Sequence, residues 1–567
     1  MKFSEMKYVR PDMDNSIKYI EETIKKIKDA KTAQEQIKLI YEIDKWSSDF
    51  YSNISLAEVR HSIDMNDIFY KEEQDWIDEN IPLISTKLID KNKAIFNSKF
   101  KDELIKEFGK HLFDLIECEL LFDDRAVPYI QKENALVTQY QKIIADSQIE
   151  FDGNVYTITQ MTPLLQNMDS DKRKGAYEAL WEFFNKNQDK FDEIYDKLVK
   201  VRTEKAKALG FNNYIELRYK ELKRTDYNAK DVAEYREKIR KFITPLAVEL
   251  RKKQAEKIGI KDFKFYDRPI DFLDGNSKPK GDVNFIVKNA QKMYGELSPE
   301  TKEFFDFMVE NELLNLVAKK GKRAGGYCTS FNKYKSPFIF SNFNGTNGDI
   351  HVITHEAGHA FQNYMSQNMP VSEYIWSTYE SAEIHSMSME FLTWPWMELF
   401  FEEDADKFKF SALKDSIVFL PYGVTIDHFQ HWVYENPDAT PEERRKKYSE
   451  IERMYEPDLE YDNDFLNNGG KWFKQGHVFA SPFYYIDYTL AQVCAFQYLL
   501  RYLDNREKTL ANYIELCKAG GKDSFYNLLK IGKLENPITT NIVEKVAQPL
   551  REILNTLEDK VNNKSKK

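Results

Sequence analysis

The chain has 567 residues, of which 42% are hydrophobic and 31% are charged, and its formal net charge is −11. This length allows a large core or several domains, and the acidic balance argues against a nucleic-acid partner. The N-terminus lacks an apolar secretion segment and no stretch is apolar enough to span a bilayer, so we expect a cytoplasmic protein with no membrane partner.

Helical periodicity dominates the first part of the chain. Isoleucines recur at three- and four-residue spacing on both sides of Lys31, which predicts an antiparallel helical hairpin. Residues 149–158 predict a lone β-hairpin with a glycine turn, and residues 267–281 predict a loop. No repeat or low-complexity linker interrupts the chain. We therefore expect two helical lobes fused into one body, the first over residues 1–195 and the second over 196–567.

The cysteines are widely scattered and form no paired metal-binding spacing. We predict that they are reduced, buried thiols in a reducing compartment. The four residues are Cys118, Cys328, Cys494 and Cys517.

Two short strands are predicted shortly before residue 349. The first, at 325–329, begins with Gly325 and Gly326, which permit close approach of another backbone. The second, at 337–343, has an alternating pattern that predicts an exposed sheet edge.

Residues 349–365 form a helix-compatible run that contains His-Glu-Ala-Gly-His at 355–359. Residues four apart lie on one face of a helix, so His355 and His359 can bind one metal ion at roughly 2.0 to 2.1 Å while Glu356 faces its open side. Apolar neighbours predict a buried helix, and a buried His-Glu-His cluster requires a charge partner such as a metal. The pattern is typical of a zinc hydrolase that holds one Zn²⁺ per chain.

Such a site needs a third protein ligand and leaves the fourth position to water. The metzincin pattern is excluded, because Gln362 and Met365 occupy the positions of its glycine and third histidine. Cys328 is an alternative ligand, as in peptide deformylases, but those chains are far shorter. The remaining route is a glutamate on the helix that follows Pro370, where three candidates share one stripe of a helix that we expect to be packed on all sides. They are Glu380, Glu383 and Glu390.

These residues resemble the gluzincin oligopeptidases that include thimet oligopeptidase and oligoendopeptidase F, with the greatest similarity to the bacterial oligoendopeptidase F and Pz-peptidase branch. In that family the third ligand is the first glutamate of a Glu-x-x-Ser-x-x-x-Glu stretch, which residues 383–390 match. The resemblance therefore implies Glu383 as the ligand, with Glu380 as the alternative. Asp349 or Glu390 is expected to orient a ligand histidine.

A second matching stretch begins at His477 and continues through a tyrosine-rich segment. In the family this segment faces the zinc, where a phenol or an imidazole N–H can donate to the oxyanion. The resemblance implies His477, Tyr485 and Tyr488 as catalytic groups. The choice among the tyrosines stays open, because Pro482 stands where the thimet branch has a tyrosine.

The family also pairs an edge strand before the zinc helix with the extended backbone of its substrate. By resemblance, Gly326 and Tyr327 of the first predicted strand and Tyr484 of the tyrosine segment are substrate-binding residues.

The resemblance implies a mainly α fold of the gluzincin type, with two helical lobes flanking a deep substrate channel and a small β-sheet beside the zinc helix. Residues 196–567 would form the catalytic domain. The implied activity is zinc-dependent cleavage of internal bonds in short unstructured peptides, with Glu356 as general base. A zinc carboxypeptidase or aminopeptidase, or a silent peptide-binding protein, is the alternative, and an intact Glu356 argues against the last. We expect a monomer or a small homo-oligomer.

Overall fold

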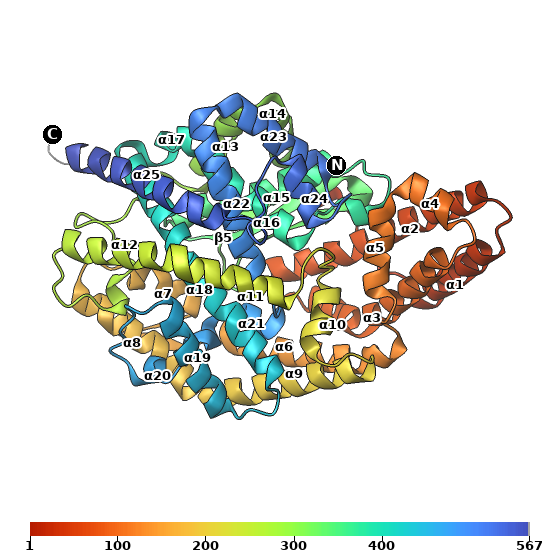
Figure 1. The fold of residues 1–567 in the computed structure, drawn as a ribbon, viewed down its shortest axis with the longest axis horizontal. Coiled ribbons are helices and arrows are strands. Elements are labelled where there is room, and N and C mark those ends of the chain that lie inside the picture. The colour runs from red at the N-terminus through yellow and green to blue at the C-terminus, as the bar shows by residue number, and fades with distance from the viewer. Residues whose placement is uncertain (565–567) are drawn as a thin grey trace.

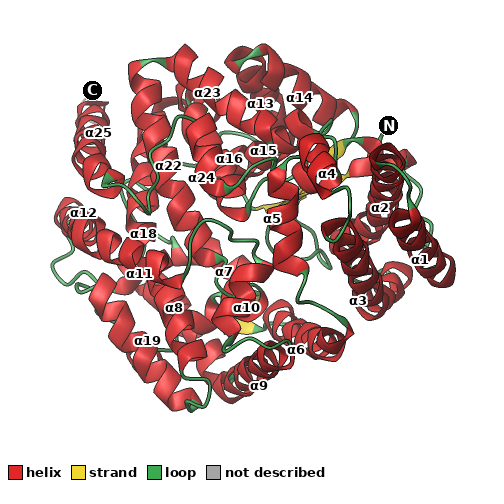
Figure 2. Ribbon diagram, turned by 45° about the vertical axis from the view of Figure 1, so that its right-hand side comes forward, coloured by secondary structure: helices red, strands yellow, loops and turns green. Residues whose placement is uncertain are grey.

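A computed structural model describes residues 1–564, and helices make up most of this part of the chain (Figure 2). The predicted mainly α fold is confirmed. The first five helices lie together at the right of Figure 1 and share an apolar core that is separate from the main one. They are α1 (Met13–Asp29), α2 (Ala33–Ile63), α3 (Ile68–Phe96), α4 (Lys101–Phe108) and α5 (Lys110–Glu119).

The predicted helical hairpin near the start consists of α1 and α2, which are joined by residues 30–32 and packed against each other. Thr32 begins α2: its side chain accepts from the N–H of Glu35, and the Glu35 carboxylate accepts from the N–H of Thr32. Ile20 of α1 and Ile43 of α2 are fully buried in the shared core. The isoleucine spacing therefore marks the faces that the two helices bury.

The next helices run along the lower half of Figure 1 and belong to the main core. The predicted boundary between the two helical lobes, at residues 195 and 196, falls inside α9. The division into two lobes stays a prediction. The helices are α6 (Val127–Ala145), α7 (Ile158–Leu165), α8 (Ser170–Lys186), α9 (Gln188–Ala208), α10 (Tyr214–Glu221), α11 (Ala229–Lys238) and α12 (Thr244–Lys257), and α13 (Val283–Leu297) and α14 (Pro299–Glu310) follow.

The predicted β-hairpin is present as β1 (Ile149–Phe151) and β2 (Asn154–Tyr156), paired antiparallel. Its two turn residues, Asp152 and Gly153, have φ values of 49° and 74°. Aspartate and glycine tolerate this left-handed conformation, which two-residue hairpin turns require.

A three-stranded sheet lies against helix α15 (Gly348–Ser366), with strand order β3-β5-β4. β4 (Tyr327–Phe331) and β5 (Ser336–Phe343) correspond to the two predicted strands, whereas β3 (Leu314–Val317) was not predicted because four residues carry too little pattern. The predicted exposed edge at 337–343 is wrong. β5 is the buried central strand, since β3 pairs with one side of it and β4 with the other, and the edge belongs to β4.

Helices α15 and α16 (Tyr379–Leu392) pack closely, and Gly358 lies at their contact. A Cβ atom at Gly358 would lie 2.5 Å from the carbonyl oxygen of His385 and 2.6 Å from the Cα of Ser386. Only glycine fits there, because side-chain carbons do not approach backbone atoms so closely. Nearly every side chain of α16 is buried, as its sequence predicts.

The remaining helices complete the main core, and α22 packs against both α16 and α18. They are α17 (Glu398–Phe401), α18 (Ala405–Glu435), α19 (Pro441–Tyr455), α20 (Asp464–Asn467), α21 (Gly476–Ala480), α22 (Tyr485–Asp504), α23 (Arg506–Ala519), α24 (Phe525–Ile531) and α25 (Ile542–Lys564).

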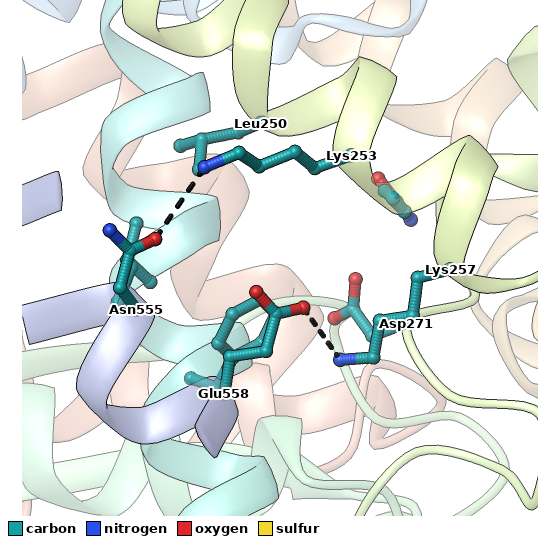
Figure 3. Close-up of a pocket in the computed structure, with 9 residues that line it drawn as sticks. Leu250, Lys253, Lys257, Asp271, Asn555 and Glu558 are labelled. Carbon is teal, nitrogen blue, oxygen red and sulfur yellow. Dashed lines mark hydrogen bonds and ion pairs between the residues drawn. The ribbon is translucent and has the colours of Figure 1, made fainter. Parts of the chain in front are cut away.

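The C-terminal helix α25 closes against α12 and leaves a cavity of about 10 Å³ between them, room for about one water molecule (Figure 3). Lys257 and Glu558 form an ion pair of 3.5 Å across it, and Lys253 donates to Asn555 at 3.5 Å. This cavity is a packing feature of α25, because it is too small for an organic ligand.

No helix within residues 1–564 is long and apolar enough to cross a membrane. All four cysteines are unpaired, and three are buried as predicted; the fourth, Cys328, is half-buried in β4.

We predict that Gly358→Ala lowers the free energy of unfolding by about 1–3 kcal/mol, because the new methyl group forces α15 and α16 apart. The matched control is Gly295→Ala in α13, where the nearest atom to a Cβ, Lys302 Cγ, lies 3.9 Å away. That substitution should raise stability by about 0.5–1 kcal/mol through helix propensity. Chemical denaturation of both variants checks the expectation, and equal effects would contradict it.

Candidate metal and active site

The structure brings His355, His359 and Glu383 together. Their three ligand atoms lie within 4.8 Å of one another, and within residues 1–564 they form the group able to hold a metal ion. The two histidines lie one turn apart on α15, and Glu383 reaches them from α16. Neither Cys328 nor Glu380, the alternative ligands, belongs to the group.

The spacing of this group fits a tetrahedral ion. The Oε2 atom of Glu383 lies 3.4 Å from Nε2 of His355 and 3.5 Å from Nε2 of His359. Two ligands bound at about 2.1 Å in a tetrahedron lie about 3.4 Å apart. Two imidazoles and a carboxylate are also a donor set that zinc prefers.

Glu383 is ionised and held in place. Burial opposes its charge, but the two histidines outweigh burial and hold the pKa of Glu383 well below its usual value. Ser386 donates to its Oε2 at 3.0 Å, and Tyr484 donates to its Oε1 at 2.5 Å. Its Oε2 is thus the oxygen that faces both histidines.

Glu390, one of the two predicted orienting residues, contacts a ligand histidine. Its Oε1 lies 2.8 Å from Nδ1 of His355, and its Oε2 lies 3.1 Å from Nδ1 of His351. Burial favours the protonated acid, but these hydrogen bonds outweigh it and lower the pKa of Glu390 to about 2. A carboxylate only accepts, so Nδ1 of His355 carries a proton toward Glu390, and Nε2 is the nitrogen that faces Glu383 and would bind a metal.

Asp349, the other predicted orienting residue, does not contact the histidines. Its carboxylate accepts from the backbone N–H groups of Asn344 and Gly345 at 2.9 and 2.8 Å, at the start of α15. This is the usual role of an acidic residue in a first helical turn.

Glu356 is buried beside the ligand histidines, and its Oε2 finds no hydrogen-bond partner among the described residues. Burial raises the pKa of Glu356, and His355 and His359 oppose the shift. A buried carboxylate without a partner that has a raised pKa is suited to accept a proton.

Gly326 of the predicted first strand lies beside this base, just before β4. A Cβ at Gly326 would lie 3.7 Å from Oε1 of Glu356 and 3.4 Å from the carbonyl oxygen of Phe340. Tyr327 stacks on Phe340 with ring centroids 4.8 Å apart. The start of β4 therefore passes close to the carboxylate of Glu356, with the side chain of Val352 also 3.4 Å from the Cβ position of Gly326.

His477 of α21 and three tyrosines lie next to the ligand group. Nε2 of His477 lies 3.4 Å from the hydroxyl of Tyr488, and its ring stacks at 5.9 Å on Tyr484, which bonds Glu383. The ring centroid of Tyr485 lies 5.1 Å from that of His477, and Tyr485 also packs edge-on against Phe419 and Tyr422.

The nearby charged groups differ among the three tyrosines. After burial, Glu383 and then Tyr485 and Glu356 raise the pKa of Tyr488, whereas burial alone raises that of Tyr485. The charge of Glu383 therefore raises the pKa of Tyr484 and of Tyr488, whereas it is not among the causes for Tyr485. Tyr484 is predicted to bind substrate, and in the structure its hydroxyl also donates to the carboxylate of Glu383.

Sequence reasoning missed His351 and the role of Gly358. His351 lies one turn before His355 on the same helix face, a signal that was available. The sequence around Gly358 carried no sign of its contact with α16, because the contacting residues lie more than 20 positions further along the chain.

Two family models match this chain. The model of the peptidase M3 N-terminal domain matches residues 3–122, and that of peptidase family M3 matches residues 163–547. Two helices bring two histidines and a carboxylate around one point, and peptidase family M3 is a family of metallopeptidases. The chain belongs to peptidase family M3.

Two curated relatives match part of the chain. Group B oligopeptidase PepB of Streptococcus agalactiae is 23% identical over 383 residues, which cover 65% of this chain and 60% of that protein. The chromosomal oligoendopeptidase F of Lactococcus lactis subsp. cremoris is 24% identical over 429 residues, covering 70% and 65%. The chain thus spans less than two thirds of the length of both.

Solved structures match over their whole length. A structure of Pz peptidase A with an inhibitor superposes with a TM-score of 0.96 at 48% identity and covers 99% of this chain and 100% of that one. Oligoendopeptidase F from Enterococcus faecium has a TM-score of 0.60 at 14% identity, covers 97% and 99%, and supports the fold alone.

We predict that Glu390→Gln lowers zinc affinity by about 10- to 100-fold, because His355 loses its anionic hydrogen-bond partner. Glu380→Gln on the same helix is the matched control: Glu380 is buried, whereas Glu390 is half-buried, and it is bonded by Tyr227, outside the ligand group. Competition titration with a chromophoric chelator measures both affinities. An unchanged affinity in Glu390→Gln would remove Glu390 from the site.

Proposed function

We propose that this chain is a zinc-dependent oligoendopeptidase that cleaves internal bonds of short unstructured peptides. The observation that carries the proposal is the spacing of three donor atoms, on His355, His359 and Glu383, that suits one tetrahedral zinc ion. Membership of a metallopeptidase family and relatives named oligopeptidase or oligoendopeptidase support it.

Each side chain has a proposed role. When bound, zinc supplies a Lewis acid that lowers the pKa of a coordinated water and polarises the scissile carbonyl. Glu356 accepts the proton of the attacking water at its carboxylate and passes it to the leaving amine. His477 and Tyr488 are proposed to donate to the oxygen that becomes negative in the transition state, with Tyr485 or Tyr484 as the alternative phenol. Glu390 keeps the Nε2 atom of His355 aimed at the metal.

The peptide is proposed to bind as an additional strand along β4. This strand is the edge of the sheet, and its main-chain groups on the outer side are available to an extended peptide. Gly326, Tyr327 and Tyr484 remain the proposed substrate contacts. Their position beside Glu356 and Glu383 would place a peptide bond of that strand over the ligand group.

We further propose that the enzyme works in the cytoplasm as a monomer or a small homo-oligomer, with two helical lobes around a deep channel. Four unpaired cysteines fit a reducing compartment, and the net charge of −11 does not suit nucleic acid. The division at residue 195 belongs to the same proposal.

We predict that Glu356→Gln keeps about one zinc ion per chain and lowers kcat by several orders of magnitude, because the base is lost but the ligands stay. Metal analysis and peptide-cleavage rates give the two readouts. Cys328→Ser is the control: this half-buried thiol lies near Glu356 but outside the ligand group, and its removal should preserve both zinc and rate. Loss of zinc from Glu356→Gln would contradict the assigned role.

We predict that peptides up to roughly 20 residues are cut internally and that folded proteins are not, because an extended peptide needs only about 3.3–3.6 Å per residue while a folded chain cannot enter an enclosed channel. Mass spectrometry of a peptide library, with and without a chelator, identifies the cleaved bonds. The same sequence embedded in a folded domain is the control. Equal rates on both would refute the channel, and trimming from one end only would favour an exopeptidase.

A further inference from the structure

Three arginines hold the backbone of the segment that carries His477 and the tyrosines. Nη2 of Arg202 donates to the carbonyl oxygen of Phe479 at 2.5 Å, and Nε of Arg218 donates to that of Pro482 at 3.1 Å. Nη2 of Arg224 donates to the carbonyl oxygen of Phe483 at 2.6 Å. These arginines lie in α9, in α10 and just after α10, more than 250 residues earlier in the chain.

Phe483 is the residue that this arrangement constrains most. Its φ is 62°, in the left-handed region that a bulky residue adopts only when its surroundings impose it. Its side chain is fully buried, and its N–H donates to the side-chain oxygen of Gln430 at 3.0 Å. Both polar groups of its backbone are thus bonded by side chains from elsewhere in the chain, Gln430 of α18 and Arg224 in the loop after α10.

Arg224 makes a second contact in the first turn of α22. The same Nη2 atom lies 2.8 Å from Oδ1 of Asp487, and the side chains of the pair are 1% and 0% exposed. Asp487 lies between Tyr484, whose carbonyl oxygen accepts from its N–H at 2.9 Å, and Tyr488. One guanidinium therefore bonds both the turn before α22 and the helix turn from which the two tyrosines project.

Arg224 also connects this turn with the helix of the third ligand. Its guanidinium lies 5.5 Å from the ring centroid of Tyr227, and the Tyr227 hydroxyl donates to Glu380. Glu380 lies one turn before Glu383 on α16. The chain of contacts from Phe483 through Arg224 and Tyr227 ends at the helix that carries the metal-binding carboxylate.

We infer that Arg224 is a positioning residue for peptide hydrolysis, which sets Tyr484 and Tyr488 relative to Glu383 without touching the substrate. This inference rests on the proposed function. A buried ion pair contributes little to stability on average, whereas an error of about 1 Å in the position of a reacting group can cost about 100-fold in rate. Loss of the Arg224 contacts should therefore lower the rate in addition to any effect on folding.

The test uses the full-length, zinc-loaded enzyme. Arg224→Gln alone leaves Asp487 as an unpaired buried charge, so Arg224→Gln/Asp487→Asn is measured as well, and Arg224→Lys retains the charge. We expect about one zinc ion per chain, KM within about 2-fold of wild type, and kcat lower by about 10- to 100-fold, with part of the rate recovered in Arg224→Lys.

A matched pair on α8 controls for the loss of any buried arginine. Arg173 is 2% exposed, donates to the carbonyl oxygen of Asn167 at 2.6 Å and pairs with the buried Asp267. Arg173→Gln/Asp267→Asn should lower the melting temperature and leave kcat of the folded protein unchanged. An equal loss of kcat in this control would overturn the inference.

A double-mutant cycle shows whether Arg224 acts through the tyrosines. In a Tyr484→Phe/Tyr488→Phe background, the Arg224 substitutions should lower kcat by less than about 2-fold, because the groups that they misplace are absent. Full additivity, or a change in KM alone, would overturn the inference. If zinc-loaded wild type shows no chelator-sensitive cleavage, the proposed function fails; if wild type is active and the Arg224 variants match it, only the positioning role fails.

Discussion

The site depends on the close approach of two helices. α15 presents His355 and His359 on one face, but a third ligand exists only because α16 comes near enough for Glu383 to reach both histidines. Gly358 permits that approach, since any side chain at this position would overlap the backbone of residues 385 and 386. The glycine of the His-Glu-Ala-Gly-His motif therefore has a packing role that is separate from the chemistry of its neighbours.

The close packing of α15 and α16 also brings several charged side chains together in a buried site. Glu356, Glu383 and Glu390 lie around two histidines, where desolvation raises the cost of each carboxylate. Hydrogen bonds offset part of this desolvation free energy, because His355 donates to Glu390 and Tyr484 donates to Glu383. A divalent cation would balance the rest, which is the physical reason for reading the cluster as a metal centre.

The proposed oxyanion side of the site is organised differently from the proposed metal side. The metal ligands come from two adjacent helices, close in sequence, whereas the tyrosine segment is held by arginines that precede it by more than 250 residues. Arg202 and Arg224 are almost fully buried and bond backbone carbonyl oxygens, and the one that Arg224 bonds belongs to Phe483 at a strained turn. The relative position of the two halves of the site is thus a property of the whole fold.

Much of the site was available from the sequence, because it is local. The spacing of His355 and His359, the buried character of α15 and α16 and the glutamate stripe each lie within one helix, where helical periodicity governs side-chain direction. Only tertiary structure decided the rest. It made β5 the central strand and β4 the edge, because pairing partners are not encoded in a strand's own pattern. It also aimed Glu390 at His355 and brought Arg224 to Phe483, since these contacts depend on how distant helices pack.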